Sequence, residues 1–116
     1  MRTVLKSKIH RARVTQADLH YEGSITIDRN LMDAADLVPF ERVQIVNVNN
    51  GARIETYLIP GPRGSREIQV NGAAARLFYR GDRIIVCAFA LLDEAEIRSH
   101  HPKVVILDAA NHVATA

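Results

Sequence analysis

The sequence contains no tryptophan, one cysteine and no hydrophobic run long enough to cross a membrane. A single thiol, Cys87, cannot close a disulfide within the chain, so nothing indicates an oxidising compartment. The first residues, MRTVLKSKIHRARV, lack the apolar stretch of a signal peptide. The longest apolar run, residues 84–92, has about half of the roughly 20 residues that a membrane helix needs. We therefore expect a cytoplasmic protein that has no membrane partner.

A large excess of one charge is also missing. Fifteen Lys and Arg residues against 13 Asp and Glu residues leave a net charge of +2, and aromatic residues make up only 5% of the chain. Both values are low for a surface that binds nucleic acid through phosphate contacts and base stacking. We therefore expect no nucleic-acid partner. A non-catalytic small β-barrel that binds nucleic acid or a protein partner is kept as the alternative to an enzyme.

Common cofactor and metal motifs are absent, since the chain has no GxGxxG, Walker A, CxxC or HExxH segment. His100 and His101 are adjacent, which points their side chains in different directions, and no cysteine completes a ligand set. We predict no metal site. GPRGS at residues 61–65 is predicted to form a turn, because Pro62 lacks the amide donor that a phosphate loop would use.

Short, interrupted apolar runs predict one mainly β domain over residues 1–116. A hairpin is expected from two β-branched runs, 43–48 and 54–59, that flank Asn49, Asn50 and Gly51. Further strands are predicted at residues 3–14, 24–28, 67–70, 83–92 and 104–107. Short helices are predicted at 31–35, 73–78 and 93–99, each led by a capping residue (Asp28, Asn71 and Asp93), and the tail from 108 is expected to be frayed or lightly paired. Many short strands in a small domain favour a closed barrel, because closure removes exposed edges.

Two segments, 8–28 and 50–75, mix cations, hydroxyls and glycines with apolar residues. On a strand, Lys8 and His10 share one face while Ile9 takes the other. Arg53 and Tyr57 share a face by the same alternation, which would bring a guanidinium and a phenol to one pocket. A hairpin with one solvent-facing side produces the same pattern, so alternation alone leaves both interpretations open.

Five segments in this order and spacing extend the argument: KIHRARVT from residue 8, ADLHYEGSITID from 17, NGARIETY from 50, RGS from 63 and VNGAAA from 70. Together they resemble the pyruvoyl-dependent aspartate 1-decarboxylase family over nearly the whole chain. Val46 stands where some members carry tryptophan, and the C-terminal tail is shorter than in several relatives. The resemblance implies a six-stranded double-psi β-barrel that assembles as a homotetramer, with active sites between neighbouring subunits.

The resemblance also implies a zymogen that cuts itself between Gly23 and Ser24 into a short β chain, 1–23, and an α chain, 24–116. The Ser24 oxygen would attack the Gly23 carbonyl, Thr56 would stabilise the oxyanion, and Ser24 would become a covalent pyruvoyl cofactor. We expect Gly23 beside the attacked bond because glycine tolerates strained angles and close approach. The mature lyase would form a Schiff base with L-aspartate and release β-alanine and CO2, for pantothenate and coenzyme A biosynthesis.

Further roles are implied at matching positions. Tyr57 would be the proton donor, and Lys8 and Arg53 would hold the two substrate carboxylates. The remaining substrate-binding residues would be Thr56, Gly72, Ala73 and Ala74, and the supporting residues His10, Tyr21 and Asn71. On an undistorted strand Thr56 faces away from Arg53 and Tyr57, so its role requires a bulge, a twist or another subunit. A member that folds without maturing, or that needs a maturation partner, fits the same sequence.

Overall fold

The computed structural model describes residues 1–116 and is mainly β. The helical elements are α1 (Arg29–Ala34), the 3₁₀ helix η1 (Gly72–Leu77) and α2 (Glu94–Arg98). The strands are β1 (Arg2–Arg13), β2 (Gln16–Asp18), β3 (Ser24–Asp28), β4 (Arg42–Asn47), β5 (Arg53–Gly61), β6 (Ile68–Asn71), β7 (Arg83–Leu92), β8 (Lys103–Leu107) and β9 (Val113–Thr115). Every predicted strand is present. The three-residue strands β2 and β9 were not predicted as strands, and β9 pairs with β8, so the tail is lightly paired as expected.

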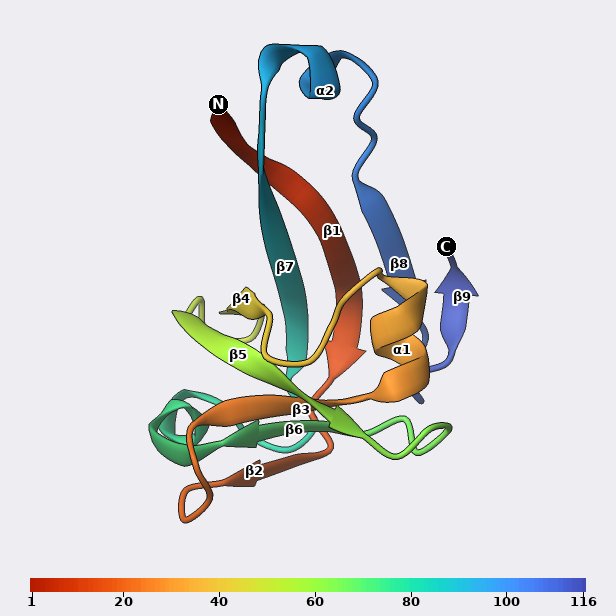
Figure 1. The fold of residues 1–116 in the computed structure, drawn as a ribbon. Coiled ribbons are helices and arrows are strands. Elements are labelled where there is room, and N and C mark those ends of the chain that lie inside the picture. The colour runs from red at the N-terminus through yellow and green to blue at the C-terminus, as the bar shows by residue number, and fades with distance from the viewer.

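The strands form one sheet in the order β2-β6-β3-β5-β4-β7-β1-β8-β9. Three neighbouring pairs are parallel: β1 with β8, β2 with β6, and β3 with β5. Parallel neighbours need crossover connections, so strands that are distant in sequence come to lie side by side. In Figure 1 α2 follows the long strand β7 at one end of the molecule, and β2, β3 and β6 lie at the other end. The β3–β5 contact is the one that builds the candidate site.

The predicted hairpin is confirmed as β4 and β5. Val43 pairs with Thr56 and Ile45 with Ile54, with no register shift along the ladder. The connecting loop covers residues 48–52, longer than a two-residue turn, and Gly51 adopts φ +77° in it. Because the ladder is regular, the residues of β5 from Arg53 to Tyr57 alternate between the two faces of the sheet.

The inward faces of the strands meet in one apolar cluster of 20 buried residues. Ile25 and Ile27 of β3, Val43 and Ile45 of β4 and Phe78 after η1 are among those with 1% exposure or less. Burying a side chain of this size contributes roughly 1.5–3 kcal/mol relative to leaving it in water. The cluster therefore fixes the strands that carry the site.

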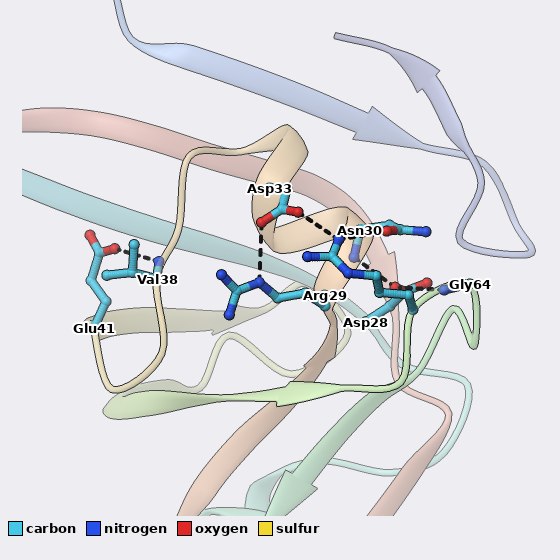
Figure 2. Close-up of polar contacts among 8 residues, drawn as sticks. Asp28, Arg29, Asn30, Asp33, Val38, Glu41 and Gly64 are labelled. Atoms are coloured by element: carbon cyan, nitrogen blue, oxygen red, sulfur yellow. Dashed lines mark hydrogen bonds and ion pairs between the residues drawn. The ribbon is translucent and has the colours of Figure 1, made fainter.

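Asp28 fastens the end of β3 to α1 and to the turn of residues 62–66 (Figure 2). Its carboxylate is 2% exposed and accepts hydrogen bonds from the backbone N–H groups of Asn30 (2.8 Å), Gly64 (3.0 Å) and Arg66 (2.8 Å). The predicted cap at Asp28 is confirmed, and GPRGS forms the expected turn. A buried carboxylate with three donors is well satisfied, so this cluster is structural.

The other two predicted helix starts differ from each other. Asp93 caps α2 through a capping box with Glu96, as the sequence predicts. Asn71 precedes η1 but makes no capping bond, because its side-chain amide is directed into β3 instead. No helix of the structure has the length and apolar character needed to cross a membrane.

Candidate active site

Ser24 is the first residue of β3 and one of the few buried polar residues, with 1% exposure. Its hydroxyl donates a hydrogen bond to the carbonyl oxygen of Glu22 at 3.2 Å. The same oxygen accepts a hydrogen bond from Nδ2 of Asn71 at 3.0 Å. The Ser24 side chain is thus turned back along the chain, toward the peptide units that precede it.

Asn71 lies directly opposite Ser24 in the antiparallel pair of β3 and β6 and is fully buried. Its Oδ1 accepts from Nε2 of Gln69 at 2.7 Å, and Nδ2 also donates to the Thr26 hydroxyl at 3.1 Å. The amide therefore cannot rotate without losing several buried hydrogen bonds. Sequence reasoning named Asn71 but missed Gln69 and Thr26. Strand alternation was the available signal, since each lies two residues from Asn71 or Ser24 and so on the same face.

Gly72 lies against the predicted scissile residue. It adopts φ +73°, and a Cβ added there would lie 2.6 Å from Cα and 2.7 Å from N of Gly23, and 3.1 Å from the carbonyl oxygen of Tyr21. Gly23 itself has no positive φ, and a Cβ added to it would meet nothing within 4 Å. Gly23 therefore shows neither a left-handed backbone nor a contact that a Cβ would block, and the approach of the Ser24 hydroxyl to its carbonyl stays a prediction. The close approach occurs at Gly72, whose missing side chain lets β6 reach the residues before Ser24.

A cleft of about 330 Å³ opens beside this contact. Its lining residues are Gly23, Ile54, Glu55, Thr56, Ala73, Ala74 and Leu77. Ile25 pairs with Leu58 in the parallel ladder of β3 and β5, and continuing that register by two residues places Gly23 level with Thr56. Thr56 and Gly23 line the same cleft, and the β4–β5 ladder has no bulge at Thr56.

Tyr57 lies outside this cleft. Its ring is 36% exposed and packs near Phe40, with ring centroids 6.4 Å apart and planes tilted by 35°. It lines an adjoining surface hollow with Thr56, Glu55 and Arg42, of which Thr56 and Glu55 also line the cleft. Glu55 and Arg42 form an ion pair. Within one chain Tyr57 therefore does not line the cleft that Gly23 lines.

Lys8 and Arg53 also lie away from the cleft, near Cys87. Lys8 is directly opposite Cys87 in the β1–β7 ladder, and Arg53 lies in β5 opposite Val46. Burial raises the pKa of the Cys87 thiol, and the positive charges of Lys8 and Arg53 act in the opposite direction. Both cations thus act on one region of the sheet.

The two remaining supporting residues are separate from the cleft as well. Burial, and secondly the charges of Lys8 and Arg11, lower the pKa of His10, so its ring is neutral at neutral pH. Its Nδ1 is buried without a hydrogen-bond partner. Tyr21 is 54% exposed, and the Cβ placed on Gly72 meets its backbone oxygen rather than its ring.

One chain therefore brings together Gly23, Ser24, Thr56, Asn71, Gly72, Ala73 and Ala74, and leaves Lys8, His10, Tyr21, Arg53 and Tyr57 outside the cleft.

The family model of aspartate decarboxylase matches residues 1–114. The chain belongs to the aspartate decarboxylase family. It is a member of a family of carboxy-lyases, so an enzyme is supported over the binding-module alternative.

Relatives in this family are similar over most of their length. The chain is 59% identical over 111 residues to a protein of Salinibacter ruber named aspartate 1-decarboxylase, covering 96% of this chain and 76% of that protein. It is 60% identical over 110 residues to a protein of the same name from Syntrophobacter fumaroxidans, covering 95% and 89%. A third, from Carboxydothermus hydrogenoformans, is 58% identical over 111 residues, covering 96% and 87%.

Solved structures support the fold. A rationally designed protein, mkDPBB_sym_86, superposes with a TM-score of 0.50 at 10% identity, over 71% of this chain and 95% of that one. Its name denotes the double-psi β-barrel. The double-psi barrel type predicted from the sequence is therefore confirmed, but the sheet has nine strands and is not closed, so the expected closure and six-strand count are not shown.

Proposed function

We propose that this chain cuts itself between Gly23 and Ser24 and then decarboxylates L-aspartate at the α-carboxylate, releasing β-alanine and CO2 for pantothenate biosynthesis. The observation that carries the proposal is the buried Ser24 hydroxyl, held by Asn71 beside a glycine that lines an open cleft. The names of the relatives support aspartate as the substrate. The cytoplasmic location predicted from the sequence belongs to the same proposal.

The cut begins with attack of the Ser24 oxygen on the Gly23 carbonyl carbon, which forms an ester and breaks the peptide C–N bond. The hydroxyl proton passes to the Ser24 nitrogen, which becomes a free amine. Loss of the Ser24 α-hydrogen as a proton then breaks the Cβ–O bond and releases the Gly23 carboxylate. The enamine left at position 24 takes up one water and releases one ammonia, which leaves a pyruvoyl group.

We propose that Thr56 donates to the oxyanion of the first step. It lines the cleft that Gly23 lines, and its hydroxyl has no hydrogen-bond partner within the chain. A donor already aimed at a developing oxyanion lowers the barrier by about 3 to 4 kcal/mol.

Thr56→Val is therefore expected to slow self-cleavage by about a hundredfold or more, because it keeps the shape of the side chain but removes the hydroxyl. The rate is measured from the loss of uncut chain by mass spectrometry. Thr56→Ser, which restores the donor, is expected to recover most of the rate. Equal rates for the Val and Ser variants would contradict the role.

The residues around position 24 fit a pyruvoyl group. Asn71 supplies a fixed amide donor at this position, and the small side chains of Ala73 and Ala74 leave the cleft beside Gly23 open. When present, the group supplies an electron-accepting carbonyl next to the bond that breaks. Reaction with phenylhydrazine, which attacks keto carbonyls, is expected to stop β-alanine release.

Substrate binding requires two cations and a proton donor that one chain does not place in its own cleft. Lys8 and Arg53 face the region around Cys87, and Tyr57 lies in an adjoining hollow. We propose that these residues complete the cleft of a neighbouring subunit in a homotetramer. Arg53 would hold the retained β-carboxylate, since tight binding of the departing α-carboxylate would stabilise the ground state. Tyr57 would protonate the α-carbon after CO2 leaves.

Arg53→Ala is expected to raise the KM for L-aspartate about a hundredfold, since a bidentate guanidinium–carboxylate pair is lost. Self-cleavage should continue, because the attack of Ser24 on Gly23 does not involve the substrate carboxylate that Arg53 would hold. Steady-state kinetics of the cut protein measure the change. Arg98→Ala, in α2, is a matched control that should leave the KM unaltered. An unaltered KM for the Arg53 variant would contradict the assignment.

A further inference from the structure

A second cleft, of about 310 Å³, shares no residue with the Gly23 cleft. Three of its lining residues are arginines: Arg13 at the end of β1, Arg66 in the turn before β6, and Arg80 before β7. The other lining residues are Val14, Thr15, Ser65, Ala109, Ala110 and Asn111. No carboxylate lines this cleft.

The three guanidinium groups have no counter-charge within the chain. The six ion pairs of the structure engage other residues. Of the carboxylates next to the cleft in sequence, Asp82 accepts from Asn47 and from the backbone of Tyr79, and Asp108 accepts from the backbone of Ala110 and His112. Glu67, which follows Arg66, does not line the cleft and forms none of the ion pairs. Like charges gathered without a partner repel one another, and an anion placed between them removes that cost.

One buried side chain fixes the backbone of two of these arginines. Asn111 is 2% exposed, and its Nδ2 donates to the carbonyl oxygens of Arg13 (2.9 Å) and Arg66 (3.1 Å). Its Oδ1 accepts from the N–H of Arg13 at 2.8 Å. The residue after Arg80, Gly81, donates from its N–H to the carbonyl oxygen of Val14 at 2.7 Å. All three arginines therefore extend from a rigid frame, which reduces the entropy lost on binding a ligand.

We propose that this cleft binds a phosphate-bearing small molecule. Guanidinium groups match phosphate oxygens with paired N–H donors, and several of them suit a group that carries more than one negative charge. Ser65 adds a hydroxyl whose oxygen accepts from Glu67 and whose hydrogen is free to donate. A cleft of this size suits a small molecule rather than a nucleic-acid duplex. The inference does not depend on the proposed decarboxylation.

The adjoining surface predicts the rest of the ligand. A neighbouring hollow shares Thr15 and Arg80 with the arginine cleft and is also lined by Leu19, Phe78 and Tyr79. Tyr79 is 69% exposed, so its ring is open to a flat partner. A ligand with its phosphates on the arginines would place an apolar or ring-shaped part in this hollow, as a nucleoside diphosphate can.

Isothermal titration of the full-length protein with pyrophosphate and with ADP tests the proposal. Both are expected to bind, ADP about tenfold more tightly, and the double variant R66Q/R80Q should weaken both by at least about a hundredfold. R98Q is the matched control and should bind as the unaltered chain does. Circular dichroism and thermal melting show whether each variant is folded.

Three results are decisive. Loss of binding in a folded R66Q/R80Q variant, with R98Q unaffected, supports the arginine site. The proposal is overturned if R66Q/R80Q binds both compounds as tightly as the unaltered protein does. It is also overturned if neither compound binds at about 10 mM, ten times a weak dissociation constant of about 1 mM. Equal affinity for ADP and pyrophosphate overturns the role of the Tyr79 hollow and assigns the site to free phosphates.

Discussion

Replacing Ser24 with alanine is expected to leave a single uncut chain and to lower decarboxylation by more than about a thousandfold. The variant lacks the oxygen that attacks Gly23 and the atoms from which a keto group could form. It should remain folded, since the change removes two hydrogen bonds, the one from Nδ2 of Asn71 and the one to the Glu22 carbonyl oxygen; leaving a buried donor without an acceptor costs about 1–3 kcal/mol. Intact mass and β-alanine release measure the two effects.

The chain offers a matched control for this substitution. Gly64–Ser65 is the other Gly-Ser pair, but it lies in the turn after β5, with Gly64 at φ +82° and Ser65 exposed. No side-chain amide donates to the Ser65 hydroxyl. Ser65→Ala should therefore mature and react as the unaltered protein does. A cut Ser24→Ala chain, or a loss of cutting in Ser65→Ala, would contradict the choice of Ser24.

Gly72→Ala is expected to slow self-cleavage by about a hundredfold, because its Cβ would overlap Cα and N of Gly23 and displace the attacked peptide unit. Positive φ adds a conformational cost of roughly 1–2 kcal/mol for an L side chain. The variant is also expected to be less stable than the unaltered protein. The cutting rate of its folded fraction separates the effect on self-cleavage from the effect on stability. Mass spectrometry over time, together with denaturant unfolding of each variant, measures both.

Gly51→Ala isolates the conformational cost. Gly51 has φ +77°, close to the +73° of Gly72, but a Cβ added there meets nothing within 4 Å. This variant should lose a similar amount of stability from backbone strain and cut at the normal rate. If Gly72→Ala cuts as fast as Gly51→Ala, the contact with Gly23 does not position the scissile bond.

Local patterns predicted most of the elements. The hairpin, the strands at 24–28 and 83–92, and the caps at Asp28 and Asp93 follow from β-branched runs, turn residues and side chains that accept from free N–H groups. The strands β2 and β9 have three residues each and no apolar alternation, so no local signal marks them. Asn71 was predicted to cap a helix, but its side-chain amide donates to the hydroxyls of Ser24 and Thr26 instead, and capping rules do not take such tertiary partners into account.

The site was less accessible from sequence, because its geometry depends on pairs of strands that are distant in the chain. Alternation correctly separates Thr56 from Arg53 and Tyr57, but it does not show that β3 lies parallel to β5 and brings Gly23 level with Thr56. Likewise, no local sequence pattern shows that Gly72, rather than Gly23, is the glycine where an added Cβ would overlap a neighbouring backbone. The resemblance to a family supplied the names of these residues, and the strand pairing shows which of them meet in one chain.

The intact mass of the purified, denatured protein tests the central claim most directly. Self-cleavage predicts two species, one ending at Gly23 and one beginning at position 24 that is lighter by one ammonia than the uncut sequence from Ser24 would be. The second species should react with phenylhydrazine at its new carbonyl. A single uncut chain of 116 residues that persists after prolonged warming would contradict autonomous self-cleavage between Gly23 and Ser24.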